Sequence, residues 1–156
     1  MRSAGLQLLH LWRRLSPWPG GKWLFGRLFS LRVPYSGSVR PRFLVLAPGH
    51  AEIEIPDRRA NRNHLESVHA IALVNVAEQA SGLAMLTGLP PGFRGIVTHI
   101  AMEYLKKARG PIRAVSTVAV PQVTTDTDIA VTADCLDRQG AVVARATVRW
   151  RVGPVR

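Results

Sequence analysis

Glu78 is the residue with the clearest chemical potential, because it is a carboxylate in the middle of an apolar segment. Residues 68–86 are too long for one strand and are apolar nearly all round, which predicts a buried helix. Glutamate is almost never fully buried without a partner, and burial of an unpaired carboxyl raises its pKa. Perturbed carboxyls concentrate at active sites, so Glu78 is a candidate catalytic group. The other interpretation is a carboxylate that points out through a gap or pairs with an arginine of a sheet.

His69 and Ala70 lie at the start of the same predicted helix. Backbone N–H groups have no acceptor within the helix there, and the positive end of the helix dipole strengthens their field. Such a position can polarise a carbonyl oxygen and stabilise a developing oxyanion. The alternative for His69 is that it only caps the helix or packs against it.

Other common site chemistries are not indicated. The five histidines show no metal-binding spacing, and the chain has no phosphate-binding loop of the Gly-x4-Gly-Lys type. A single cysteine, Cys135, rules out an intramolecular disulfide and is typical of a reducing compartment. We therefore expect a cytoplasmic protein without a metal or other cofactor.

Asn63, His69, Ala70 and Glu78 form a pattern with defined spacing. The Asn precedes the His by six residues, a small residue follows the His, and the acid comes nine residues after the His. This pattern resembles the PaaI-type acyl-CoA thioesterases of the hotdog superfamily, in which the acid lies inside a central helix.

The resemblance extends over roughly residues 40–152. Residues 103–110 resemble the strand and turn that follow the family's helix, and residues 137–150 resemble its closing hairpin. The chain is most similar to a little-characterised branch of the superfamily that carries an N-terminal helical arm. The resemblance implies an α+β hotdog fold, with an antiparallel sheet wrapped around one long helix.

The same resemblance implies that the protein hydrolyses an acyl-CoA thioester. Glu78 would be the nucleophile or the general base that activates water, and the N–H of Ala70 would form the oxyanion hole. His69 and Asn63 would help to orient the thioester and the water. Glu78 and Ala70 are about two helical turns apart, ~12 Å at a rise of ~1.5 Å per residue. Family members build each site across a dimer, so we expect a homodimer or a homotetramer.

Four positions depart from the family pattern. Ala70 and Ile71 stand where the family often has Gly-Gly, and the acid, Glu78, is Glu rather than the commoner Asp. The family's hydroxyl residue on the third strand falls at Val97, with Thr98 beside it. The departures at Ala70-Ile71 and at Val97 favour an alternative in which the domain binds an acyl group or CoA without turnover.

A second alternative is a hotdog dehydratase or hydratase. His64 and Glu78 are fourteen residues apart, which is the spacing of the His and Glu in hotdog acyl-carrier-protein dehydratases. Dehydratases have a proline-rich segment and a Pro-Gly pair before the helix, and residues 57–67 directly before this predicted helix contain neither.

Basic residues are candidates for binding the phosphates of coenzyme A. The chain carries a net charge of +11, which attracts polyanions in general. The two clusters are Lys106, Lys107 and Arg109 at a strand end, and Arg58, Arg59 and Arg62 before the helix. Thr98 is a further candidate substrate contact. The alternative is a solvated basic surface. Nucleic acid is not expected as a partner, because aromatic residues do not interleave with the basic ones.

Alternating polar and apolar residues predict one antiparallel sheet with one buried face. The predicted strands are residues 42–47, 51–56, 96–105, 112–120, 128–136 and 142–152. A sheet with one apolar face and a helix that is apolar all round are covered most simply when the sheet wraps the helix. We expect Ile96, Ile100, Met102 and Tyr104 to share one face. The residues expected to close an acyl tunnel between helix and sheet are Ile71, Val74 and Met85.

Two short amphipathic helices, residues 3–15 and 22–32, are predicted before the sheet. We expect residues 1–35 to form a helical arm and residues 36–156 to form the hotdog domain. The arm would pack on its own domain or on a partner subunit. Its mixture of basic and apolar residues also fits peripheral contact with a membrane surface, or an organelle-targeting peptide. No apolar run approaches the ~20 residues of a membrane-spanning helix.

Overall fold

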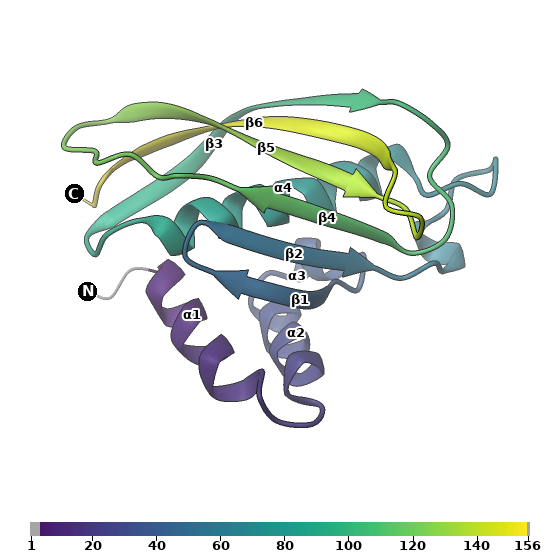
Figure 1. Ribbon diagram of the computed structural model, residues 1–156, viewed down its shortest axis with the longest axis horizontal. Helices are drawn as coiled ribbons and strands as arrows, with labels where there is room; N and C mark the ends of the chain where they lie inside the picture. Colours follow the sequence, from purple (N-terminus) through teal and green to yellow (C-terminus); the bar gives the residue numbers. More distant parts are fainter. Residues whose placement is uncertain (1–3, 156) are drawn as a thin grey trace.

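A six-stranded antiparallel sheet wraps around one long helix, and shorter N-terminal helices pack on the side of that helix that the sheet leaves open (Figure 1). The computed structural model describes residues 4–155. The helices are α1 (Ala4–Leu15), α2 (Gly21–Arg32), α3 (Pro34–Gly37) and α4 (Ala70–Gly88), with a 3-10 turn at Arg59–Asn61. The strands are β1 (Arg42–Ala47), β2 (His50–Ile55), β3 (Phe93–Tyr104), β4 (Ile112–Thr117), β5 (Thr127–Leu136) and β6 (Val142–Pro154). The predicted α+β architecture is confirmed.

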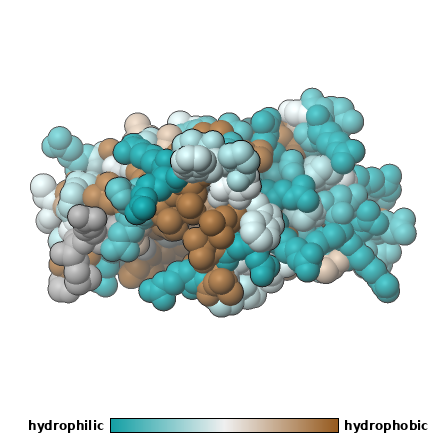
Figure 2. Space-filling view, turned by 90° about the horizontal axis from the view of Figure 1, so that it is seen from below, coloured by the Kyte–Doolittle hydropathy of each residue, from teal (hydrophilic) through white to brown (hydrophobic). Residues whose placement is uncertain are grey.

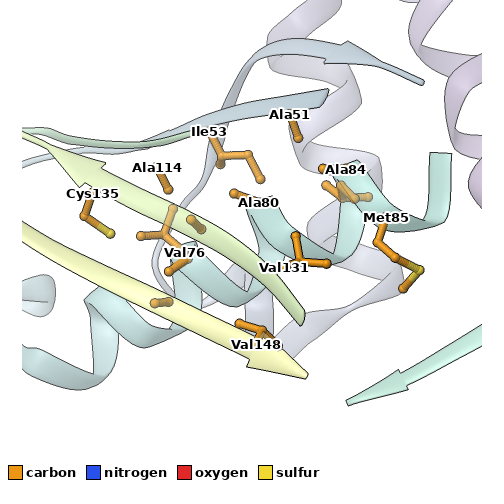
Figure 3. Packing of buried hydrophobic residues seen from close by; sticks show 14 of the residues in the cluster. Ala51, Ile53, Val76, Ala80, Ala84, Met85, Ala114, Val131, Cys135 and Val148 are labelled. Atoms are coloured by element: carbon orange, nitrogen blue, oxygen red, sulfur yellow. The ribbon is translucent and has the colours of Figure 1, made fainter. Parts of the chain in front are cut away.

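The core lies between the sheet and α4. The strand order is β1-β2-β4-β5-β6-β3, and all neighbours are antiparallel, so β1 and β3 form the two edges. Ile53 of β2, Val131 of β5 and Val148 of β6 lie around Val76 and Ala80 of α4 (Figure 3). All five side chains are completely or almost completely buried. Several small alanines on α4 allow the sheet to approach the helix closely.

A bulge in β3 changes which way Ile96 points. The register with β6 shifts at Thr98, which is an extra residue in the strand. An inserted residue interrupts the alternation of side chains between the two faces. Ile100 therefore lies opposite the buried Val148, whereas Ile96 lies opposite the exposed Arg151. The predicted shared face holds only from Ile100 onward, and the inclusion of Ile96 is wrong.

A cluster of aromatic rings attaches the arm to the sheet. Trp12 of α1 packs edge-to-face on Phe25 of α2, with 5.2 Å between ring centroids. Phe25 and Phe29 each pack on Phe43 of β1, with 4.9 Å between centroids. Such pairs contribute roughly 0.5–1.5 kcal/mol each beyond the area that they bury. The arm thus packs on its own domain and shares one hydrophobic core with it.

Polar contacts make a second attachment, between α4 and the short helix α3 that the sequence pattern did not predict. The side-chain amide of Asn75 donates to the carbonyl of Tyr35 at 3.3 Å, and that of Gln79 donates to the carbonyl of Ser36 at 3.2 Å. These amides lie against α3 and not against the sheet. The division of the chain between residues 35 and 36 falls inside α3 and stays a prediction.

α4 corrects one expectation about membranes. By length and composition alone, this helix is apolar enough to cross a membrane. However, 67% of the most apolar 18-residue stretch of this helix is buried inside the domain. Its apolar character is therefore explained by its position in the core.

The close approach of α1 to α4 can be tested with an added methyl group. A Cβ on Gly5 would lie 2.0 Å from the carbonyl oxygen of Leu86, and a backbone atom cannot move away cheaply. We expect Gly5→Ala to lower the free energy of unfolding by about 1–3 kcal/mol. A Cβ on Gly26 would lie 3.2 Å from the carbonyl of Pro41, so Gly26→Ala should cost less. Chemical denaturation measures both, and a Gly5→Ala variant as stable as wild type would contradict this contact.

Candidate active site

Glu78 lies on α4, half-buried, on the wall of a cavity. Among residues 4–155, no group donates a hydrogen bond to its carboxylate and no cation pairs with it. Burial removes water from the charged form and so raises the pKa of Glu78 above its ordinary value. An unpaired carboxyl with a raised pKa, still open to a cavity, is suited to exchange protons with a ligand.

The indole of Trp150 covers α4 one turn after Glu78. A Cβ on Gly82 would lie 2.8 Å from the Trp150 ring, so glycine is what allows the ring to rest on the helix backbone. The same Cβ, placed on Gly82, would lie 3.9 Å from Oε1 of Glu78. Trp150 Nε1 donates to Oγ of Ser81 at 3.4 Å, and Oγ of Ser81 donates to the carbonyl of Glu78 at 2.9 Å. The sheet is therefore linked by hydrogen bonds to the helical turn that carries the carboxylate.

The sequence pattern did not single out Gly82 or Trp150 as part of the site. A glycine inside a long helix normally lowers helix stability, so Gly82 was a signal of close packing that could have been used. Trp150 gave no such signal, because it followed the ordinary alternation of a strand.

The first turn of α4 is capped by His69. Its Nδ1 accepts the N–H of Ile71 at 3.1 Å, so the neutral imidazole carries its proton on Nε2. The ring is exposed, which leaves Nε2 open to solvent. Among the described residues, no acceptor receives the N–H of Ala70, and the hydroxyl of Tyr104 donates to the carbonyl of Ala70 at 3.2 Å. His69 thus caps the helix, and the backbone N–H of Ala70 remains available as a hydrogen-bond donor.

Asn63 shapes the loop before α4. Its Oδ1 accepts the N–H of Leu65 at 2.9 Å and the N–H of Ser67 at 3.2 Å. These bonds close a turn in which Glu66 has a left-handed φ of 54°. The amide oxygen of Asn63 is thus used within its own loop.

One chain does not bring all predicted catalytic groups together. Glu78 comes eight positions after Ala70 on α4, which is a distance of ~12 Å along the helix at a rise of ~1.5 Å per residue. One stripe of α4 and the inner side of the edge strand β3 remain partly uncovered, and we call this the α4–β3 face. Its residues are Ile71, Val74 and Glu78 of α4 with Ile100, Met102 and Tyr104 of β3. Ile71 is 54% exposed and Tyr104 is 50% exposed, which is high for large apolar and aromatic side chains beside a core.

The predicted basic clusters lie side by side at the N-terminal end of α4. The N–H of Val68 donates to the carbonyl of Ala108 at 2.8 Å, which joins residues 62–68 to residues 106–109. Lys106 pairs with Asp137 at 2.7 Å, and Arg62 pairs with Asp57 at 2.7 Å.

The other members of the clusters differ in their contacts. Lys107 and Arg109 are exposed and have no ion pair within the described part of the chain. Arg58 is used structurally, since its guanidinium donates to the carbonyl of Ser38 and to Asn61. Thr98 lies away from both clusters, at the bulge in β3, and its hydroxyl donates to the carbonyl of Arg149.

A cavity of about 470 Å³ lies between the arm and α4, and we call it the arm cavity. Its lining is mostly apolar and comes from α1, α2, α3, α4 and β6. The three expected tunnel walls, Ile71, Val74 and Met85, do not line it. Met85 is fully buried and fills the space next to Gly95 of β3. The expected position of the acyl tunnel is therefore not supported.

A second pocket, of about 370 Å³, is lined by Arg59, Arg62, Asn63 and Glu66. This pocket lies in the basic loop before α4. It brings a predicted phosphate ligand, Arg62, together with Asn63.

Cys135 is not a candidate nucleophile. Burial, with a smaller contribution from the nearby Asp134, raises the pKa of its thiol to about 12. The thiolate form needed for attack is therefore scarce at neutral pH.

The outer side of the arm carries apolar residues beside basic ones. Trp18, Trp23 and Leu31 are strongly exposed, and Lys22 and Arg27 lie among them. Figure 2, seen from below, shows apolar side chains gathered in the middle of this face of the molecule and hydrophilic ones toward its ends. Membrane contact by the arm stays a prediction.

The chain has a hotdog fold, which it shares with solved structures. A Pseudomonas aeruginosa protein of unknown function, named as a probable thioesterase, matches with a TM-score of 0.74 and 23% identity over 82% of this chain and 92% of its own. A thioesterase family protein from Silicibacter pomeroyi matches with a TM-score of 0.71 and 21% identity over 83% of this chain and 96% of its own.

The chain belongs to the family described as a domain of unknown function, DUF4442, whose model matches residues 21–152. The structural-genomics protein APC5556 is 32% identical, with a TM-score of 0.83 over 97% of this chain and 99% of its own. That coverage includes the arm. None of the curated proteins matches the chain in sequence.

The burial of Glu78 predicts a pH-dependent change in stability when the residue is replaced. The folded protein binds a proton at Glu78 up to a higher pH than the unfolded chain does. The contribution of Glu78 to stability is therefore fully present below the ordinary pKa of 4.5 and is lost as the pH rises through the raised value. Glutamine does not ionise, so Glu78→Gln should be more stable than wild type at neutral pH and lose this advantage in acid. Chemical denaturation from acidic to neutral pH measures the difference.

Glu54→Gln is the matched control, because Glu54 is half-buried on β2 and pairs with Arg42 at 3.5 Å. This control should bring no gain at neutral pH. A stability difference between Glu78→Gln and wild type that does not change with pH would contradict the desolvation of Glu78.

Proposed function

We propose that the protein hydrolyses acyl-CoA thioesters, with Glu78 as the catalytic carboxylate. The observation that carries this proposal is an unpaired, half-buried carboxylate on the central helix of a hotdog domain, facing an apolar cavity. A thioester has an apolar acyl group next to an electrophilic carbonyl. A site for it needs an attacking oxygen, a donor for the carbonyl oxygen and an apolar space.

In this reaction Glu78 takes a proton from water while the water oxygen attacks the thioester carbonyl carbon. The carbonyl oxygen becomes an oxyanion in the tetrahedral intermediate. The C–S bond then breaks, and the proton passes from Glu78 to the leaving sulfur, which gives CoA and a carboxylic acid. A raised pKa makes the carboxylate a stronger base than an ordinary glutamate, which assists the first step. Direct attack by the carboxylate is the other route open to the same residue.

The oxyanion donor in this proposal is the N–H of Ala70 from a second subunit. That N–H is free of any described acceptor and lies at the positive end of the α4 dipole. The exposed Nε2 of His69 is a second donor beside it. Because ~12 Å of helix separates Ala70 from Glu78 in one chain, the two groups meet only if another copy supplies one of them.

The α4–β3 face supports a homodimer. β3 is an edge strand of 12 residues, and its inner side exposes Ile100 and Tyr104 next to the uncovered Ile71. Long edge strands with exposed apolar residues tend to pair with another chain. A copy paired along β3 would cover this face and bring its own α4 toward Glu78.

The nucleotide part of CoA would bind at the basic end of α4. Lys107 and Arg109 are exposed and unpaired within the described residues, and Arg62 lines the pocket of about 370 Å³. Lys106 is held by Asp137 and contributes its charge from the edge of this cluster. Guanidinium and ammonium groups in this arrangement suit phosphate oxygens.

Thiol release from acyl-CoAs tests the role of Glu78. With a panel of short, long and aromatic acyl-CoAs, we expect Glu78→Gln to reduce kcat/KM at least ~100-fold, because the base is removed. Glu54→Gln should keep wild-type activity. In wild type, the acidic limb of the pH profile of kcat/KM should lie above the ordinary pKa of glutamate, 4.5. Unchanged activity in a folded Glu78→Gln variant would refute this mechanism, and an inert wild type that still binds CoA would favour a binding protein.

Ala70→Pro tests the shared site. Ala70 is the first residue of α4, where proline is tolerated, and His69 before it has φ −62° and ψ 138°, which proline permits. The substitution therefore removes the N–H and keeps the helix. Alone, Ala70→Pro should lose activity as Glu78→Gln does.

When the two inactive variants are unfolded and refolded together, activity should return to about a quarter of wild type. Half of the randomly formed dimers are mixed, and one of the two sites in each mixed dimer has both intact groups. Glu78→Gln refolded with itself is the control. No recovery in verified mixed dimers would place both groups in one chain and contradict the proposal.

A further inference from the structure

We propose that the acyl chain of the substrate binds in the arm cavity, so that the N-terminal arm selects the length of the acyl group. This inference rests on the proposed thioesterase function for its chemistry. It differs from the sequence expectation, which placed the acyl group between α4 and the sheet.

The chemistry of the lining fits an alkyl chain. The cavity is walled by Leu8 and Leu11 of α1, Phe25 and Leu28 of α2, and Leu83 and Leu86 of α4. Such walls offer dispersion contacts and no hydrogen-bond partners along most of their length. The cavity therefore favours a long apolar group over a polar one.

The same cavity also has polar groups in its lining. Glu78 is in its wall, and the others are Gln7, Arg32, Ser36 and Gln79. A thioester carbonyl placed beside the carboxylate of Glu78 would leave its alkyl tail to the leucines of the same lining. One cavity thus offers both a carboxylate for the reacting group and apolar walls for the alkyl chain.

The volume gives the scale of the alkyl chain that this partly open cavity can hold. Each group the size of a water molecule takes up about 30 Å³ in a liquid, and a methylene is of similar size. A cavity of about 470 Å³ therefore holds roughly 15 such groups when it is full. This size suits acyl groups of medium length, about 8–14 carbons.

The opposite side of α4 offers no comparable space. Val76, Ala80 and Ala84 face the sheet and are completely buried (Figure 3). Met85 fills the room next to Gly95, where an added Cβ would lie 2.4 Å from the Met85 methyl group. On the arm side, by contrast, Leu28 is 40% exposed and Leu8 and Leu11 are only partly buried. Apolar space for a ligand is therefore found between α4 and the arm and not between α4 and the sheet.

The arm is held firmly enough to form a wall. Gly5 brings α1 into backbone contact with Leu86, and the ring pairs of Trp12, Phe25 and Phe43 fix α2 on β1. The cavity thus lies between two elements whose spacing is set by contacts outside it. A side chain enlarged inside the cavity should consume space without moving either element.

Leu28→Trp is the test, with Leu31→Trp as its matched control. Both leucines lie on α2, three residues apart, and only Leu28 lines the cavity. Leu31 is 72% exposed, so the same substitution there changes the surface alone. Binding is measured by calorimetry with S-butyl-, S-octyl- and S-dodecyl-CoA, thioethers that cannot be hydrolysed. Turnover is measured separately with the corresponding acyl-CoAs, and thermal unfolding checks that each variant is folded.

In wild type, we expect Kd to fall roughly two- to fourfold for each added methylene until the cavity is full. Leu28→Trp should weaken binding of S-dodecyl-CoA at least tenfold and leave S-butyl-CoA within about twofold. Leu31→Trp should follow wild type at every length. Turnover should show the same dependence on length.

Two results separate this inference from the proposed function. Length-dependent binding that only Leu28→Trp removes, together with no turnover of any thioester, would support the acyl site and refute the thioesterase. Binding that ignores chain length, or equal losses in Leu28→Trp and Leu31→Trp, would overturn the acyl site even if Glu78-dependent turnover is found.

Discussion

The structure depends on covering α4, a helix that is apolar almost all round. Such a helix is stable only if every side is shielded from water, because exposed apolar area costs about 25 cal/mol per Å². The concave sheet covers one side and the arm covers another. The third side, the α4–β3 face, is left partly exposed in a single chain, next to an edge strand. The same requirement that gives the fold its layers therefore supports assembly with a second copy.

Glu78 lies on α4 next to both the arm and the α4–β3 face, and that position explains its partial burial and its raised pKa. Deep in the sheet-facing core, a carboxylate would need a partner or would remain protonated. On the open surface it would behave as an ordinary glutamate. Beside Trp150 and Gly82, and on the wall of the arm cavity, it loses water without gaining a partner. We expect this charge to lower the stability of the folded protein at neutral pH, which is the trade-off predicted for a catalytic carboxylate.

Much of the fold followed from patterns that act locally. Strand alternation, the long apolar segment and the turn residues between them predicted all six strands and α4 within a few residues. The errors arose where distant segments decide the outcome. The bulge at Thr98 depends on the pairing of β3 with β6, and no local pattern predicts it. The arm cavity depends on how α1 and α2 pack on α4, so walls were expected among helix residues that face elsewhere. For the site, spacing along one helix indicated Glu78, His69 and Ala70, but the residues that line the same cavity as Glu78 come also from β6 and the arm.

In a domain made only of a sheet and a helix, close packing of the core conflicts with the need for a pocket of variable shape. The arm allows these two requirements to be met in different places. Residues between α4 and the sheet are close-packed, and enlarging or shortening them typically costs 1–5 kcal/mol of stability. A substrate pocket placed there could change shape only at the expense of the core. Leu8, Leu11 and Leu28 border the cavity from the arm side and are themselves only partly buried. Substitutions at these positions alter the volume of the cavity while the sheet and α4 keep their contacts. A cavity between the arm and the helix is therefore the part of this fold whose shape can change with least effect on stability, which suits the acyl site that we propose there.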